Sequence, residues 1–300
     1  LIIKLMKHIN DVQRLKKILD EIITKPQKFF HYGIKNKKYA NLKIKISKLA
    51  SKVFGPDGPQ RIHLKKIGTI HIPFFSYGNI TSINMWDLED MILFSYYLKK
   101  SNYYDAAYDL GANIGFHSIV FSKLGYKKIT CFEPEVDHLK QIKKNLKLNN
   151  SEAVKICPKA VFNKSKKVQF NKIHGNTTSS HILNAKKNPY GVITKYYVQA
   201  VDVKHILPKK GKSIFKIDIE NVEGVVIKRT TANDWNFFDA FVEIGGQQNA
   251  KKIFQHCKKI KINIFAHKIK WKKVKKFTDM PKSYHDGLVF MSKSNDFNLN

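Results

Sequence analysis

Strand-like and helix-like segments alternate through the middle of this 300-residue sequence, and this alternation restricts the fold more than any other feature. Short apolar runs of strand length are separated by longer segments with helical periodicity, and the turns between them are brief. Such alternation produces parallel strands whose crossover helices cover both faces of one sheet. The sequence therefore predicts an α/β fold with a doubly wound, Rossmann-like sheet. The strands expected first are residues 104–109, 128–132 and 152–157, and the helices between them are residues 115–124 and 136–148.

Later segments extend the same pattern towards the C-terminus. Residues 174–194 form a polar loop that is long for a compact domain, and such loops often serve as lids or binding loops. Asp87 is placed to cap a helix that runs to about residue 99. Further strands are expected at residues 166–172, 196–203, 214–220, 238–244, 260–266 and 287–292, and further helices begin near residues 223 and 247.

The first 60 residues differ from the rest of the chain in composition and in the spacing of their apolar residues. Apolar side chains recur at helical spacing over residues 1–24, and the residues that follow are lysine-rich and irregular. We therefore predict two parts, which are a helical and irregular N-terminal extension (residues 1–60) and a main domain (residues 61–300).

The composition excludes several classes of protein. Apolar residues make up 43% of the chain, which is too many for a disordered protein. No apolar stretch approaches the length that crosses a bilayer, and lysine interrupts the first residues too early for a signal-peptide core. The three cysteines are far apart and fit buried side chains in a reducing compartment. We therefore expect a cytoplasmic protein without a transmembrane segment.

The formal net charge of +32 points to an anionic partner such as nucleic acid or a membrane surface. Only three of the 55 basic residues are arginine, however, and the lysines are spread along the whole chain. Arginine is favoured for bidentate recognition of phosphate and guanine because its planar fork matches two acceptors. The charge therefore indicates weak, salt-sensitive binding of polyanions through lysine.

The sharpest motif lies in residues 108–117 (YDLGANIGFH), which follow a strand and open a helix. Glycines there let the backbone come close to a ligand, and the helix start offers free N–H groups. Glu133 ends the next strand, 24 residues after Asp109. A carboxylate in that place can accept hydrogen bonds from both hydroxyls of a ribose. An ordinary strand–turn–helix without a ligand would explain the glycines alone, but it would not explain the spacing to Glu133.

This motif differs from the dinucleotide fingerprint, in which Gly-x-Gly-x-x-Gly brings a helix onto a pyrophosphate. Asn113 stands where the second glycine of that fingerprint would be, so a nicotinamide-dependent dehydrogenase is not expected. A ligand with adenine and ribose but no pyrophosphate fits better. S-adenosylmethionine (SAM) is such a ligand, and we predict it as the cofactor.

A second cluster of charged residues lies in the segment FKIDIENVE, residues 215–223. Alternate strand residues share a face, so Lys216, Asp218 and Glu220 are expected on one side. A parallel strand in mid-sheet is normally apolar on both faces, and buried carboxylates are costly unless they are paired or used. Either Lys216 and Asp218 form a structural pair, or Asp218 and Glu220 emerge at the carboxyl edge of the sheet, where ligands bind in open α/β folds.

Taken in order, these motifs resemble the FkbM family of class I methyltransferases, over roughly residues 60–293. The resemblance implies a seven-stranded sheet with the last strand antiparallel, SAM as methyl donor, and a hydroxyl on a sugar or natural-product-like small molecule as acceptor. The family pattern usually has Gly-Ala where this chain has Asn221-Val222, but asparagine tolerates left-handed backbone. The matching segments are residues 109–115 (DLGANIG), 132–134 (FEP) and 216–220 (KIDIE) with Glu223, and more weakly residues 175–180 (GNTTSS) and 198–202.

Methyl transfer to a hydroxyl benefits from a base within hydrogen-bond reach, because a neutral hydroxyl is a weak nucleophile. Asp218 is the first candidate for this base, and Glu220 and Glu223 come next. Glu243, after the following strand, and the loop residues His174 and His181 are weaker candidates.

The remaining site residues are assigned to the cofactor. We expect Asp109 and Gly111 at the methionine end of SAM, Asn113 and Gly115 shaping the loop, and Glu133 on the ribose. Asp218 and Glu220 are too few oxygen ligands to predict a divalent cation, and no histidine pair has zinc-ligand spacing, so no metal site is predicted.

Two other functions fit parts of the sequence. An RNA methyltransferase acting on ribose hydroxyls is permitted by the charge and by the set Lys216, Asp218, Lys228 and Glu243, but the shortage of arginine opposes it. A non-catalytic nucleic-acid-binding protein on a fold that has lost its cofactor is the second alternative.

Overall fold

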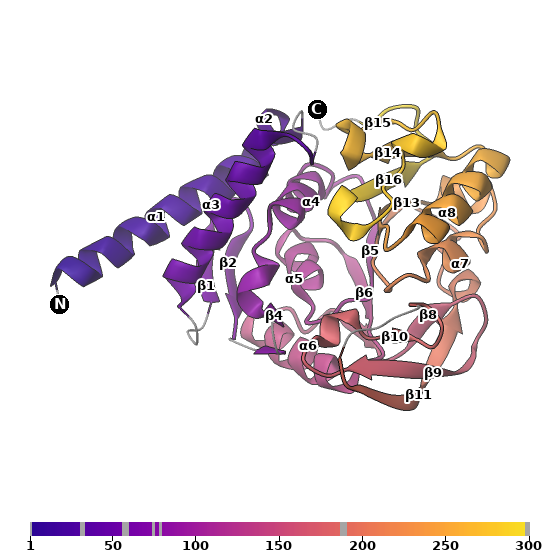
Figure 1. Ribbon diagram of the computed structural model, residues 1–300, viewed down its shortest axis with the longest axis horizontal. Coiled ribbons are helices and arrows are strands. Elements are labelled where there is room, and N and C mark those ends of the chain that lie inside the picture. The colour runs from indigo at the N-terminus through magenta and orange to yellow at the C-terminus, as the bar shows by residue number, and fades with distance from the viewer. Residues whose placement is uncertain are drawn as a thin grey trace.

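The computed structural model describes residues 2–30, 34–55, 60–73, 76–77, 80–186 and 191–297. An eight-stranded sheet crosses the middle of the molecule, with strands in the order β15-β14-β16-β13-β12-β5-β6-β7 (Figure 1). The neighbouring strands from β13 to β7 are all parallel, and β16 is antiparallel to both β13 and β14. The bounds are β5 (Ala106–Leu110), β6 (Lys128–Phe132), β7 (Lys155–Cys157), β12 (Ser213–Ile217), β13 (Phe238–Glu243), β14 (Asn263–Ala266), β15 (Lys272–Lys273) and β16 (Leu288–Ser292).

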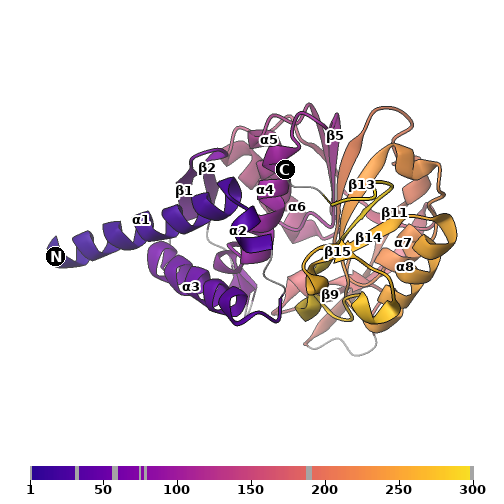
Figure 2. The same ribbon diagram turned by 90° about the horizontal axis from the view of Figure 1, so that it is seen from above.

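Helices cover both faces of this sheet, as the alternating pattern predicts. The helices α4 (Leu88–Lys99), α5 (Phe116–Lys123) and α6 (Val136–Leu148) lie on one face, and α7 (Glu223–Ile227) and α8 (Gln247–Ile260) lie on the other (Figure 2). The predicted α/β class and doubly wound topology are therefore confirmed. Seven strands have the arrangement that the family resemblance implies, with the final strand antiparallel, and the two-residue β15 adds an eighth at the edge.

The strand expected at residues 214–220 is shorter than predicted. β12 ends at Ile217, after which Glu220 and Asn221 adopt left-handed backbone with φ of 55° and 77°. The period-2 alternation holds for Lys216 and Asp218, whose side chains form an ion pair. It does not apply to Glu220, because the chain has already left the sheet and turned towards α7.

A second, smaller sheet stands beside the carboxyl edge of the main one. It has the order β10-β9-β11-β8, with β9 and β11 antiparallel over their length. The polar segment between β9 and β11 contains a short 3₁₀ turn, η2 (Thr177–Ser179), and β10. The bounds are β8 (Ala160–Phe162), β9 (Lys166–Ile173), β10 (His181–Ile182) and β11 (Ile193–Asp202). The sequence predicts strands here but not their separation into a second sheet.

The N-terminal extension consists of α1 (Ile2–Thr24), α2 (Gln27–Phe30) and α3 (Lys37–Phe54), followed by a hairpin of β1 (Gln60–Leu64) and β2 (Gly68–Ile72). The start of α1 projects from the body, whereas its second half packs beside α4 (Figures 1 and 2). Between the hairpin and α4 lie β3 (Ser76–Tyr77), β4 (Ile80–Thr81) and a 3₁₀ turn, η1 (Ser82–Met85). The predicted boundary at residue 60 falls at the first residue of β1.

The hydrophobic core continues from the extension into the main domain. Leu15, Leu19 and Ile22 of α1 have no exposed surface, and they belong to one cluster with residues of α4 and α5. A second cluster fills the space between the other face of the sheet and α7 and α8. No described helix combines the length and apolar character that crossing a bilayer requires.

This packing predicts that the extension contributes to the stability of the whole chain. Replacement Leu19→Ala should lower the free energy of unfolding by about 2–5 kcal/mol, because it leaves a cavity in the shared core. Urea denaturation would measure the change. Met6→Ala, at a side chain that is 59% exposed, is the matched control and should change the value by less than about 0.5 kcal/mol. Equally small effects of both substitutions would contradict the shared core.

Candidate functional site

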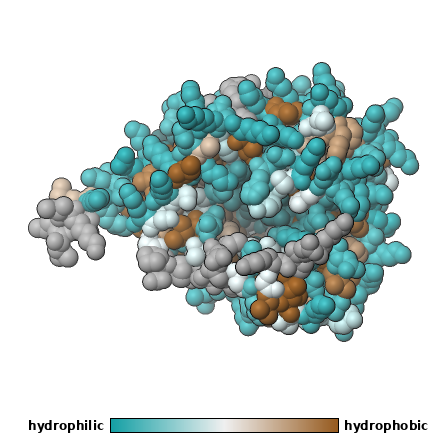
Figure 3. All heavy atoms as spheres, in the orientation of Figure 1, coloured by the Kyte–Doolittle hydropathy of each residue, from teal (hydrophilic) through white to brown (hydrophobic). Residues whose placement is uncertain are grey.

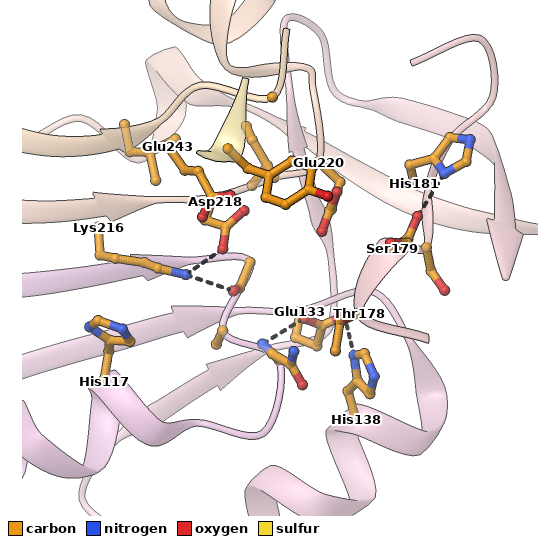
Figure 4. Close-up of a pocket in the computed structure, with 18 of the residues that line it drawn as sticks. His117, Glu133, His138, Thr178, Ser179, His181, Lys216, Asp218, Glu220 and Glu243 are labelled. Carbon is orange, nitrogen blue, oxygen red and sulfur yellow. Dashed lines mark hydrogen bonds and ion pairs between the residues drawn. The ribbon is translucent and has the colours of Figure 1, made fainter. Parts of the chain in front are cut away.

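The carboxyl ends of β5, β6, β12 and β13 border one cavity of about 710 Å³ (Figure 4). The N-terminal end of α4, the start of α6 and the polar segment between β9 and β11 complete its wall. Ligands of open α/β sheets bind at this edge. The residues singled out in the sequence that line this cavity include Gly111, Asn113, Glu133, His181, Lys216, Asp218, Glu220 and Glu243.

The turn after β5 comes very close to the end of β12, and Gly111 makes this approach possible. Its φ is +78°, and a Cβ atom built on it would lie 1.8 Å from the carbonyl oxygen of Asp218. Any side chain would therefore push the two segments apart. The glycine therefore serves a close approach of protein backbone, and it also lines the cavity in which the sequence predicts the cofactor.

Glu133 connects the end of β6 to the same turn. Its Oε2 accepts a hydrogen bond from the backbone N of Asn113 (2.8 Å), and its Oε1 accepts one from the backbone N of Glu135 (2.9 Å). Asn113 has left-handed backbone with φ of 52°. A carboxylate oxygen has two lone pairs, so each oxygen of Glu133 can accept a further bond from a ligand in the cavity.

Asp109 and Gly115 lie behind the cavity wall rather than on it. Asp109 is fully buried, and its Oδ2 accepts a hydrogen bond from Ser118 Oγ (2.7 Å). Gly115 has φ of +83° and caps the start of α5. Both residues therefore shape the turn from beneath, which fits the role predicted for Gly115 but leaves Asp109 without direct access to the cavity.

Glu223 braces the turn between β12 and α7 and does not line the cavity. Its Oε1 accepts hydrogen bonds from the backbone N of Ile219 (3.0 Å) and of Asn221 (3.1 Å), and its Oε2 is bonded by Asn249 Nδ2. Only 1% of Glu223 is exposed. The predicted catalytic role of Glu223 therefore does not fit its position. Asn221 adopts left-handed backbone with φ of 77°, the conformation that asparagine tolerates better than most residues.

Lys216, Asp218 and Glu243 meet where β12 and β13 end (Figure 4). Lys216 Nζ lies 3.1 Å from Asp218 Oδ2 and donates a longer hydrogen bond to the carbonyl oxygen of Gly111 (3.4 Å). Burial opposes the charge of Lys216, but the carboxylates around it, Asp218 first, raise its pKa above the usual value. The nearby charge of Asp218, followed by burial, raises the pKa of Glu243 well above its usual value.

Glu220 lines the cavity near Asp218. Its Oε2 lies 2.5 Å from Nζ of Lys186, which belongs to the polar segment. Burial and the charge of Asp218 raise the pKa of Glu220 to about 7. Asn221 Nδ2 also donates to the carbonyl oxygen of Ala185. These contacts attach the polar segment to the turn after β12. Residues 176–186 of this segment therefore cover one side of the cavity, and we call them the roof.

Three histidines differ in their relation to the cavity. His138 lines it, and its Nε2 lies 2.9 Å from Thr177 Oγ1 while its Nδ1 lies 3.6 Å from Glu133 Oε1. His138 therefore connects Glu133 with the roof, a role that its sequence position on an ordinary amphipathic helix did not reveal. His181 also lines the cavity, and burial lowers its pKa. His174, a weaker candidate base, is exposed and does not border the cavity.

The N-terminal extension supplies one wall residue that sequence reasoning missed. Lys43 of α3 borders the cavity and pairs with Asp87 Oδ2 (3.1 Å) and Glu89 Oε2 (3.0 Å) at the start of α4. Because this segment contains many lysines, the sequence alone does not distinguish Lys43, which borders the cavity, from the others. Within the described residues, no group of three or more histidine, cysteine, aspartate or glutamate side chains is arranged to hold a metal ion.

No protein-family profile and no curated protein sequence matches this chain. Among solved structures, precorrin-6y C5,15-methyltransferase from Geobacter metallireducens GS-15 is 13% identical over 66% of this chain and 85% of its own, with a TM-score of 0.33. A candidate SAM-dependent methyltransferase from Streptococcus mutans is 11% identical, with a TM-score of 0.37. A candidate methyltransferase complexed with SAH is 10% identical, with a TM-score of 0.39. These last two matches cover 85% of this chain and 66% of the other.

The carboxylates at the end of β12 and β13 predict a pH-dependent effect on stability. A raised pKa in the folded state means that Glu243 stabilises the fold below its unfolded pKa and loses that contribution as the pH rises through its folded pKa. Replacement Glu243→Gln should therefore raise the melting temperature of the ligand-free protein at pH 8, by about 2 °C or more.

Differential scanning fluorimetry at several pH values would measure this effect. The difference between variant and wild type should shrink towards pH 4.5, the ordinary pKa of a glutamate. A variant that is less stable at pH 8, or a difference that does not change with pH, would contradict the electrostatic account of Glu243.

Proposed function

We propose that this protein is a SAM-dependent methyltransferase that methylates a hydroxyl group of a sugar or natural-product-like small molecule. One observation carries the proposal: the turn at residues 111–114 and the carboxylate of Glu133 border the same cavity, at the carboxyl edge of a doubly wound sheet. The ordered motifs that resemble the FkbM family support the same function, and membership of that family is part of the proposal.

The residues around the turn fit a ligand with an amino-acid end and a ribose. Asn113 Oδ1 is buried and accepts no hydrogen bond from any described residue. Buried acceptors without donors are uncommon in folded proteins and often mark the place of a ligand or water. Asn113 borders the cavity directly, and Glu133 retains lone pairs beside it. A volume of about 710 Å³ lies in the range of pockets for ligands of this size.

SAM supplies a methyl group on a positively charged sulfur, which is an activated electrophile. The protein must hold an acceptor oxygen in line with that group and exclude water. The acceptor oxygen gains the methyl carbon, the sulfur keeps the electron pair of the broken bond, and the hydroxyl proton leaves to a base. The roof of residues 176–186, held by the pair Lys186–Glu220, borders the cavity and would exclude water from the part that it covers.

Asp218 is the residue best placed to take that proton. It lines the cavity at the end of β12, and Lys216 bonds its Oδ2 while no described residue donates to its Oδ1. That oxygen can accept the proton of an acceptor hydroxyl. Glu220 is paired with Lys186 and Glu223 is enclosed by backbone donors, so both are less suited to this role.

The proposal predicts that Glu133→Ala weakens binding of S-adenosylhomocysteine (SAH), the reaction product. The expected loss is about 1–3 kcal/mol, which is roughly 5- to 150-fold in Kd, because charge-assisted hydrogen bonds to the ribose hydroxyls are removed. Isothermal titration calorimetry would measure it. Glu133→Gln keeps the side-chain size and one acceptor oxygen for the backbone N of Asn113, so it tests loss of charge with less disturbance of the turn than Glu133→Ala.

Asp218→Asn is the comparison on the acceptor side of the cavity. It should abolish most methyl transfer while SAH binds with an affinity within a few-fold of the wild type. If the wild-type protein does not bind SAH, or if Glu133→Ala binds it as tightly as the wild type, the proposed function is wrong.

A further inference from the structure

The cavity is acidic although the protein is strongly basic. Among the described residues, seven acidic side chains border it, compared with four basic ones, whereas the whole chain has 23 acidic and 55 basic residues. Hydrophilic side chains cover most of the outer face shown in Figure 3. The overall positive charge of the chain therefore does not describe the cavity. The acidic residues are Asp87, Glu89, Asp90, Glu133, Asp218, Glu220 and Glu243, and the basic residues are Lys43, Lys159, Lys186 and Lys216.

Negative charge also exceeds positive charge at the ends of β12 and β13. Lys43 pairs with Asp87 and Glu89, and Lys186 pairs with Glu220. Asp218 and Glu243 therefore share Lys216, which forms its ion pair with Asp218. No described residue donates a hydrogen bond to the carboxylate of Glu243 or pairs with it, and its side chain lines the cavity beside Asp218 (Figure 4).

Two neighbouring carboxylates in a cavity are unstable when both are ionised, unless a proton or another cation lies between them. An ammonium group of a ligand can take the place of that proton and donate hydrogen bonds to both carboxylates. A phosphate group in the same position would be repelled by both. The charge around the cavity thus opposes a phosphate-rich acceptor such as RNA, in spite of the overall charge of the chain.

We infer that the methyl acceptor carries an amino group, which binds between Asp218 and Glu243, and that amino sugars and aminocyclitols are the class of substrate. This inference rests on the proposed methyl transfer and specifies the acceptor. The amino group uses one lone pair of Asp218 Oδ1 and positions the molecule. The other lone pair of Oδ1 can take the proton of a neighbouring hydroxyl, which receives the methyl group. Tyr284 borders the mouth of the cavity with 62% of its surface exposed, and its ring offers a face for the apolar side of a sugar or for the cation.

The sulfonium of SAM is a second cation that enters the same cavity, and the experiment must separate it from the acceptor. SAM and SAH differ in that charge. If Glu243 serves the cofactor, Glu243→Gln weakens SAM relative to SAH. If Glu243 serves the acceptor, the substitution changes the discrimination between a charged acceptor and its neutral counterpart.

The test uses matched probes with the full-length protein: glucosamine, galactosamine and 2-deoxystreptamine, each compared with its N-acetylated form. Dissociation constants are measured by calorimetry or ligand-observed NMR, with and without SAH. Each free amine should bind at least about tenfold more tightly than its N-acetylated form, and methyl transfer from labelled SAM should follow the same order. In Glu243→Gln this ratio should fall below about threefold.

Glu152→Gln, an exposed glutamate outside the cavity, is the matched control and should keep the wild-type ratio. The inference is overturned if no amine binds more tightly than its N-acetylated form. It is also overturned if Glu243→Gln keeps the ratio, and a weakening of SAM relative to SAH in that variant would assign Glu243 to the cofactor instead. Failure of SAH to bind would instead contradict the proposed methyl transfer, because the amine ratio is measured without cofactor as well.

Discussion

The site depends on the contact between the turn after β5 and the end of β12. Asp218 donates its backbone N–H to the carbonyl oxygen of Leu110 (3.0 Å), and the carbonyl oxygen of Asp218 lies where a Cβ of Gly111 would be. This contact places two groups side by side. On one side lie the turn and Glu133, and on the other lie Lys216, Asp218 and Glu243. A cofactor on the first group and an acceptor on the second would therefore meet in one enclosed space.

Much of the fold follows from the sequence because periodicity records which side chains are buried. The alternation of strands and helices predicted the doubly wound sheet, and Asp87 predicted the start of α4. The predictions failed where contacts between distant segments decide the structure. β12 ends at Ile217 because the next residues turn to meet the roof and α8, and nothing local in residues 214–220 records those partners. The second sheet likewise depends on the long-range pairing of β11 with β8.

The candidate site was predictable to the extent that its residues lie in motifs. Gly111, Asn113, Glu133, Asp218 and Glu220 line the cavity as the motifs indicated. Glu223 belongs to the same motif, but it accepts backbone hydrogen bonds that stabilise the turn. A single sequence does not distinguish a carboxylate that binds a ligand from one that stabilises a turn. Lys43 and His138 reach the site from segments without a motif, so only the packing of α3 and α6 reveals them.

We propose that the turn after β5 and Glu133 bind the same adenosine. A crystal structure of the complex with SAH tests this most directly. Both ribose hydroxyls should lie within about 2.6–3.2 Å of the oxygens of Glu133, with the sulfur facing Asp218 and Glu243. A nucleoside bound elsewhere, or bound in the cavity with its ribose out of reach of Glu133, would contradict the account.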